Sequence, residues 1–188
     1  MKSLLLFFLV ISSLFGAPSG LYIELGVGSG FGDSLQSSSS RVSYERGFIG
    51  SVAFGYQSGV YRVEIEERYK SDKLYSIADV LADGELRESS QMLNLYYSGY
   101  NDSKFVSSIG FGMGITALSI ENIRQFSRNM PEIKEEGILS LQGLFSVGYQ
   151  IERDITATVE YSYFYTQKSD SFGAKDESSL LFSLRYLF

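Results

Sequence analysis

The sequence predicts an all-β protein, an eight-stranded antiparallel up-and-down transmembrane β-barrel, from three observations. Apolar side chains alternate with small or polar ones at a period of two, which is the period of a β-strand. The connections between these alternating segments are short and long in turn. Glycine and serine gather on the face opposite the apolar one, which suits a barrel with a narrow interior.

The segment ELGVGSGFGD shows this pattern most clearly. Its glycines are Gly26, Gly28, Gly30 and Gly32. A dinucleotide-binding turn needs G-x-G-x-x-G followed by a helix. Here the third glycine slot holds Phe31 or Asp33, and the following DSLQSSSS is a poor start for a helix. The period of two therefore predicts a strand, with apolar side chains from Leu21 to Val27 on one face and glycine on the other.

Eight segments alternate in this way, and most approach the length of about 9–11 residues that a tilted strand needs to cross a bilayer. They are residues 21–27, 48–56, 61–66, 91–97, 105–116, 139–149, 156–163 and 179–188. The predicted short connections are residues 57–59, 99–103 and 151–154. The predicted long, polar connections are residues 33–46, 71–88, 118–137 and 166–177. Short turns at one end and long loops at the other are typical of outer-membrane barrels.

The direction in which the apolar face points separates a membrane barrel from a soluble carrier barrel. A soluble barrel would place Gly26, Gly55, Gly112 and Gly148 on its outer surface, where glycine covers a sheet poorly. The opposite orientation places the apolar face against lipid and the glycines inside a narrow barrel. We therefore expect a closed membrane barrel, because hydrocarbon cannot satisfy an open strand edge.

The composition limits the possible functions. The 188 residues include no cysteine, no histidine and no tryptophan, and the formal charge is −6. An acidic chain without a basic block predicts no nucleic-acid partner. The absence of cysteine excludes a disulfide framework and thiolate metal sites. We expect no cofactor and no bound metal.

The amino terminus has the layout of a secretory signal peptide, predicted for residues 1–19. Lys2 precedes an apolar run from Leu4 to Ile11, and small residues follow. We expect cleavage after Ser19, with Ala17 and Gly16 as alternatives. Residues 20–188 then form one outer-membrane barrel domain, exported through the periplasm.

The chain resembles the small eight-stranded outer-membrane barrels, which include the opacity-type adhesins, the OmpX-like proteins and the transmembrane domain of OmpA. The resemblance rests on YRVEIEERY, MLNLYYSG, FVSSIGFGMGI and the chain end SLRYLF. It implies lipid, lipopolysaccharide and the outer-membrane assembly machinery as partners, and places both chain ends in the periplasm. It also implies that the last strand carries an assembly signal formed by Phe182, Leu184, Tyr186 and Phe188. Ser183 and Leu181 stand where the family usually has a glycine and a polar residue.

Charged residues form the strongest polar cluster on the predicted inward face. They are Glu24, Arg62, Glu64, Glu66, Arg68, Glu160 and Arg185. They could line a pore or gate, but the interior of an eight-stranded barrel is about filled by its own side chains, and buried charges must pair. We favour a structural plug of ion pairs. A cation site built from the four glutamates is less favoured, because three arginines lie among them.

Catalysis is not expected. The enzymes known on small outer-membrane barrels use histidine with serine or acidic partners, and this chain has no histidine. Glu64 and Glu66 lie beside arginines that keep both ionised, which is unsuited to acid catalysis. The tripeptide Asn101-Asp102-Ser103 matches a glycosylation acceptor, but it falls in a predicted inner turn and is interpreted as chance.

Two outward features complete the pattern. Tyrosines near the short-turn end predict an aromatic girdle, and these are Tyr56, Tyr61, Tyr97, Tyr149 and Tyr186. Glu67 shares the parity of Val63 and Ile65, so a regular strand would point it at lipid. Either a bulge at Glu66 and Glu67 resets the alternation, or the strand has reached the head-group zone there.

These observations predict a non-enzymatic outer-membrane protein that serves envelope structure or surface interaction through its long loops, with a possible surface or host ligand. The alternative is a porin-like narrow pore for small solutes, and a soluble carrier barrel comes third. The serine run at residues 37–40 and the mixed-charge stretch at residues 120–137 are expected to tolerate deletion.

Overall fold

The computed structural model describes residues 19–31, 34–36, 41–77, 80–100, 104–125, 128–129, 132–170 and 172–188. The predicted signal peptide up to residue 18, the serine run at residues 37–40 and the tripeptide at residues 101–103 lie outside these residues. Ser19 is the first residue of the first strand. Among the described residues, no helix is long and apolar enough to cross a membrane.

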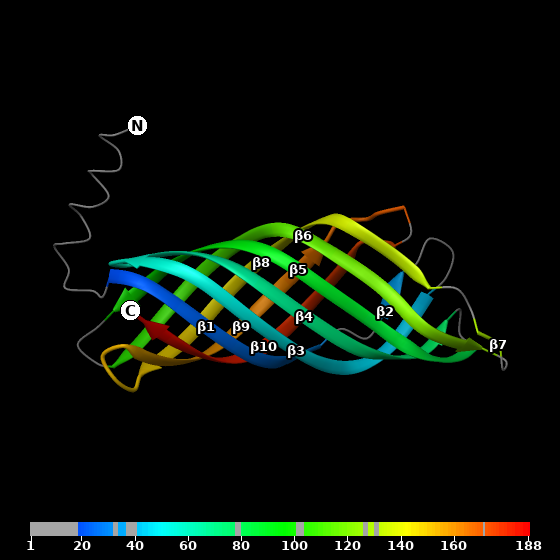
Figure 1. Cartoon of the computed structure of the whole chain (residues 1–188), viewed down its shortest axis with the longest axis horizontal. Coiled ribbons are helices and arrows are strands. Elements are labelled where there is room, and N and C mark those ends of the chain that lie inside the picture. The colour runs from blue at the N-terminus through cyan, green and yellow to red at the C-terminus, as the bar shows by residue number, and fades with distance from the viewer. Residues whose placement is uncertain are drawn as a thin grey trace.

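Eight long antiparallel strands form a closed barrel (Figure 1). They are β1 (Ser19–Gly30), β3 (Arg41–Ser58), β4 (Tyr61–Ile77), β5 (Val80–Tyr100), β6 (Phe105–Gln125), β8 (Ile133–Gln150), β9 (Ile155–Thr166) and β10 (Lys175–Leu187). Two short strands, β2 (Ser34–Gln36) and β7 (Arg128–Asn129), pair with β3 and β6. Long strands that follow each other in the chain are neighbours in the barrel, so the predicted up-and-down topology is confirmed.

The barrel closes through β1, which pairs with both β3 and β10. Ile23 lies opposite Phe54 on one side and Tyr186 on the other. The backbone N–H of Phe188 donates to the carbonyl of Leu21 at 2.8 Å. The predicted pairing of the last strand with the first is therefore confirmed, and the ring of eight long strands has no open edge within the apolar zone.

The apolar faces point outward and the polar faces inward, as predicted. Leu25, Ile65 and Phe182 are each more than half exposed, whereas Ser90, Asn94 and Ser162 are fully buried. An apolar outer wall around a polar interior is the inverse of a soluble domain. The carrier-barrel alternative does not fit this arrangement.

The inward glycines make room for large side chains that cross the interior, as predicted. A Cβ on Gly55 would lie 2.5 Å from the ring of Tyr22, and one on Gly110 would lie 2.6 Å from the ring of Tyr96. A Cβ on Gly112 would collide with Asn94 and would also lie 2.8 Å from Gln142. Close packing leaves no space for these extra atoms.

The short connections lie at the end of the barrel where the C-terminus lies (Figure 1). Gly59 has a positive φ of 59° in the turn between β3 and β4, a conformation that favours glycine. Residues 151–154 join β8 to β9, as predicted. The predicted girdle tyrosines are all exposed at this end, and the ring of Tyr61 meets that of Tyr97 edge to face at 5.7 Å.

The strands extend further into the predicted long connections than the sequence indicates. β4 and β5 remain paired up to Ile77 and Val80, and β6 reaches Gln125. The extension has its own apolar interior, in which Leu86 lies opposite Ile120 and both are buried. Much of the region predicted as loop is therefore strand, because polar outward residues conceal the alternation there.

The strand pairing at Glu67 excludes one of the two interpretations of this residue. The register of β4 is unbroken there, since Glu66 faces Ala53 and Glu67 faces Val52. The bulge interpretation is therefore wrong, and Glu67 lies on the outward face together with Ile65.

Candidate functional site

The seven charged residues predicted for the lumen all lie on the inward face of their strands. Arg62, Glu64, Glu66, Arg68, Glu160 and Arg185 are buried, and the side chain of Glu24 is 15 % exposed. The contacts divide them into two groups and one separate residue. Glu24, Arg62 and Arg185 form the first group.

Glu24 is the centre of the first group. Its carboxylate lies 3.4 Å from Nη1 of Arg62 and 3.5 Å from Nε of Arg185, and it accepts a hydrogen bond from Ser183 at 2.5 Å. The guanidinium of Arg62 also lies 4.1 Å from the ring centre of Tyr96. One carboxylate thus binds two arginines, and an aromatic ring lies over each, since Arg185 is 5.5 Å from the ring centre of Tyr22.

Glu64, Glu66 and Glu160 form the second group, which neutral donors hold. Glu64 accepts from Tyr22 at 2.5 Å and from Asn94 at 3.0 Å. Glu66 accepts from Asn94 at 2.9 Å and from Gln142 at 3.1 Å. Within the described residues, no lysine or arginine nitrogen lies within 4.0 Å of these three carboxylates. These neutral donors are not among the predicted site residues, although the alternation in the sequence places Asn94 and Tyr96 on the inward face.

The hydroxyl of Tyr96 joins two of these carboxyl groups. It lies 3.1 Å from Glu64 and 3.2 Å from Glu160. A phenol has one hydrogen, so both contacts are satisfied only when one of the two carboxyl groups carries a proton and donates to the phenol oxygen. Glu64 also accepts hydrogen bonds from Tyr22 and Asn94. In the described contacts of Glu160, the one hydrogen-bond partner is the hydroxyl of Tyr96. This geometry favours the proton on Glu160.

Arg68 stands apart from the other predicted lumen charges. Its guanidinium donates to Ser162 at 3.1 Å and to Ser179 at 2.6 Å, and lies 5.4 Å from the ring centre of Phe164. Hydroxyl groups and an aromatic face therefore bind this cation in place of a carboxylate.

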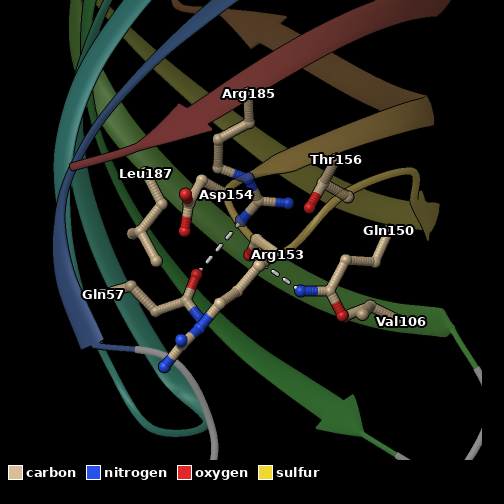
Figure 2. A pocket seen from close by; sticks show the side chains of 8 residues that line it. All are labelled: Gln57, Val106, Gln150, Arg153, Asp154, Thr156, Arg185 and Leu187. Atoms are coloured by element: carbon tan, nitrogen blue, oxygen red, sulfur yellow. Dashed lines mark hydrogen bonds between the residues drawn. The ribbon is translucent and has the colours of Figure 1, made fainter.

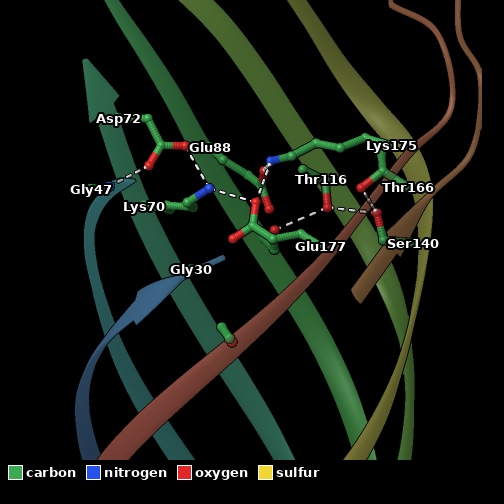
Figure 3. A network of polar contacts seen from close by, with 12 residues as sticks. Gly30, Gly47, Lys70, Asp72, Glu88, Thr116, Ser140, Thr166, Lys175 and Glu177 are labelled. Atoms are coloured by element: carbon green, nitrogen blue, oxygen red, sulfur yellow. Dashed lines mark hydrogen bonds and ion pairs between the residues drawn. The ribbon is translucent and has the colours of Figure 1, made fainter. Parts of the chain in front are cut away.

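A second charged cluster crosses the lumen at the level of the extended strands (Figure 3). Lys70 lies 2.5 Å from both Asp72 and Glu177, and Lys175 lies 2.5 Å from Glu88 and 3.0 Å from Glu177. All five side chains are buried. This cluster is not among the predicted site residues, because four of its members fall in segments predicted as loops and the fifth lies beyond the predicted end of its strand.

A small cavity opens at the end where the short turns lie (Figure 2). Its walls include Gln57, Gln150, Thr156 and Arg185, and its volume is about 20 Å³. That is room for about one water molecule. The described residues contain no group of three or more acidic, histidine or cysteine side chains that could hold a metal ion.

No family model and no curated protein sequence matches the chain. The structure resembles solved membrane barrels, however, and has the fold of the small eight-stranded outer-membrane β-barrels.

Three solved structures illustrate the likeness. Neisserial surface protein A superposes with a TM-score of 0.68 and is 17 % identical in sequence. The match covers 90 % of this chain and 98 % of the neisserial chain. The outer membrane protein OprG of Pseudomonas aeruginosa shares 14 % identity and a TM-score of 0.63, over 92 % and 98 %. Ail, the attachment invasion locus protein of Yersinia pestis, was solved with the heparin analogue sucrose octasulfate. It shares 11 % identity and a TM-score of 0.58, over 90 % and 99 %.

Proposed function

We propose that this protein is a non-enzymatic barrel of a bacterial outer membrane, serving envelope structure or surface interaction through the strands and loops beyond its apolar belt. The observation that carries the proposal is the closed barrel with an apolar outer wall and an interior crossed by paired side chains. Such a wall requires lipid, and such an interior leaves function to the loops. The likeness to solved outer-membrane barrels supports the location.

The filled lumen supports a structural role over transport. Two charged clusters and the neutral donors between them span the barrel from Arg185 to Lys175. A buried ion pair is costly to separate, because each partner would be left unpaired in a confined site. We interpret the charges predicted from the sequence as parts of this plug.

The segments at the long-loop end carry most of the net charge. Residues 33–46, 71–88, 118–137 and 166–177 contain fourteen acidic and nine basic side chains, of which Asp72, Glu88, Lys175 and Glu177 are buried in the lumen. Arg87 is already paired with Glu85 and Glu121, and Lys134 with Glu136. This balance disfavours a polyanionic ligand of the kind bound to Ail, and favours a neutral or cationic surface partner.

The narrow pore remains the second candidate, because much of the interior is polar and ion pairs can rearrange under a voltage. Conductance of the refolded protein in a planar bilayer separates the two functions, with heat-modifiable gel migration as proof of folding and a known porin as positive control. We expect no conductance steps from the folded protein. Regular steps from a preparation that is fully heat-modifiable would replace the structural role with the pore.

A further inference from the structure

Beyond three apolar outward rows, β4 and β5 carry a polar pair, and the outward rows Tyr69–Ser89 and Ser71–Arg87 follow it. Glu67 and Gln91 are cross-strand partners on the outward face. In the same row, Val52 lies beside Glu67 on β3, and Ile115 lies beside Gln91 on β6. Within the described contacts, the Glu67 carboxylate accepts one side-chain hydrogen bond, from Ser89 at 2.8 Å.

The height of this pair places it inside the apolar belt. Tyr61 and Tyr97 form the girdle contact at the short-turn end, and Glu67 and Gln91 follow them along β4 and β5. Six residues advance about 20 Å along a strand, which is about 15 Å along the axis of a barrel whose strands tilt by about 40°. The apolar band of such barrels is about 25 Å tall, so the pair faces hydrocarbon rather than head groups.

A carboxylate and a primary amide facing hydrocarbon lack the partners that water would supply. The two groups complement each other, since the amide of Gln91 donates and the carboxylate of Glu67 accepts. On a single barrel the two side chains lie side by side on one wall. Their donor and acceptor positions that point away from the wall meet lipid, which offers no hydrogen-bond partner.

We propose that two copies of this chain associate in the membrane through this wall, around a two-fold axis along the membrane normal. When two identical walls face each other across such an axis, β4 of one copy lies opposite β5 of the other. Gln91 of each copy then donates to Glu67 of the other copy, so the dimer contains two symmetry-related hydrogen bonds. Hydrogen bonds of this kind stabilise association in lipid, where apolar contact alone gives little driving force.

Cross-linking tests this geometry in the cysteine-free natural chain. Ile65→Cys and Leu93→Cys lie on the next outward row and leave Glu67, Ser89 and Gln91 intact. The two single-cysteine proteins are mixed, reconstituted together in phospholipid vesicles at a low protein-to-lipid ratio and oxidised. We expect a disulfide-linked dimer in the mixture. The matched control is Val159→Cys mixed with Phe182→Cys, an outward cross-strand pair on β9 and β10, which should not cross-link.

The polar pair itself is tested by Glu67→Leu and Gln91→Leu in the same reporter proteins. Each should weaken association roughly tenfold, because two symmetry-related hydrogen bonds are lost. Equal cross-linking by the control pair, or no effect of either leucine substitution, would overturn the dimer. This inference rests on membrane insertion, which heat-modifiable migration of the same samples reports separately. Inserted, heat-modifiable protein without the Ile65–Leu93 cross-link would overturn the dimer and leave the proposed function standing.

Discussion

The guanidinium of Arg62 lies 3.4 Å from the carboxylate of Glu24, joining β4 to β1 inside the barrel. Both groups belong to one buried cluster, so Arg62→Ala leaves Glu24 with Arg185 as its remaining cation. We expect a loss of roughly 3–5 kcal/mol, the scale for breaking a buried pair. The measurement is the urea midpoint of the refolded barrel in micelles.

Arg62→Lys provides the control for this prediction, because it keeps a positive charge on the inward face of β4 and leaves Glu24 paired with Arg185. It should unfold at a higher urea concentration than Arg62→Ala. An unchanged midpoint for Arg62→Ala would show that water solvates Arg62, and would favour the open pore.

The hydroxyl that Tyr96 shares between Glu64 and Glu160 gives a second prediction. Tyr96→Phe removes the hydroxyl that accepts from the protonated Glu160 and donates to Glu64, and should lower stability by about 1–3 kcal/mol. Glu160→Gln should be tolerated, because a neutral amide supplies a hydrogen to the phenol oxygen and removes one carboxyl group. Urea midpoints of the two variants check this. Strong destabilisation by Glu160→Gln would mean that Glu160 is held as an anion.

Gly112 and Gly143 form a matched pair that tests the packing of the lumen. A Cβ on Gly112 would collide with Asn94 inside the barrel, whereas one on the outward Gly143 meets nothing within 4 Å. Gly112→Ala should therefore destabilise by about 1–3 kcal/mol, the usual scale of overpacking, and Gly143→Ala should change little. Equal midpoints for the two variants would contradict a tightly filled interior.

Removal of the terminal residue Phe188 should affect folding in detergent and assembly in cells differently. Phe188 is 70 % exposed, and its ring packs edge to face on Tyr186 at 5.2 Å. Removing one such ring loses about 2–3 kcal/mol at most, so refolding in detergent should survive. If the assembly machinery recognises Phe188, the amount of folded barrel in outer-membrane fractions of cells should drop sharply. Phe48→Ala, which removes another outward ring, is the control, and equal assembly of both variants would refute a targeting role.

The two segments expected to tolerate deletion now differ. Deletion of residues 37–40 should leave heat-modifiable folding intact, as the sequence predicts for a polar surface connection. Deletion of residues 120–137 removes the buried Ile120 and its pairing with Leu86 and Ile133. The second deletion should therefore lower the free energy of unfolding by about 2–4 kcal/mol, which appears as a lower urea midpoint. Equal midpoints for both deletions would mean that the extended strands add no stability.

The sequence by itself determined the strand number, the closure and the direction of each face. These properties depend on the alternation within one strand, as in the row from Leu180 to Phe188, or on the length of one connection. The inward glycines were also readable, because a missing side chain at every second position is a local pattern. The absence of a bulge at Glu67 could not be predicted, since a bulge is defined by pairing with the strand beside it.

Only the tertiary structure decided which inward groups meet. Parity places Arg62, Glu64 and Arg68 inside the barrel, but the stagger between strands sets which of them share a level with Glu24, Tyr22 or Ser162. That stagger is a property of the whole closed ring and cannot be read from one strand. The sequence therefore suggested arginines as partners of the inward glutamates, whereas Glu64, Glu66 and Glu160 contact tyrosine hydroxyls and neutral amides. The same stagger brings Lys70 to Glu177 from strands far apart in the sequence, because closing the ring fixes the level of every strand at once.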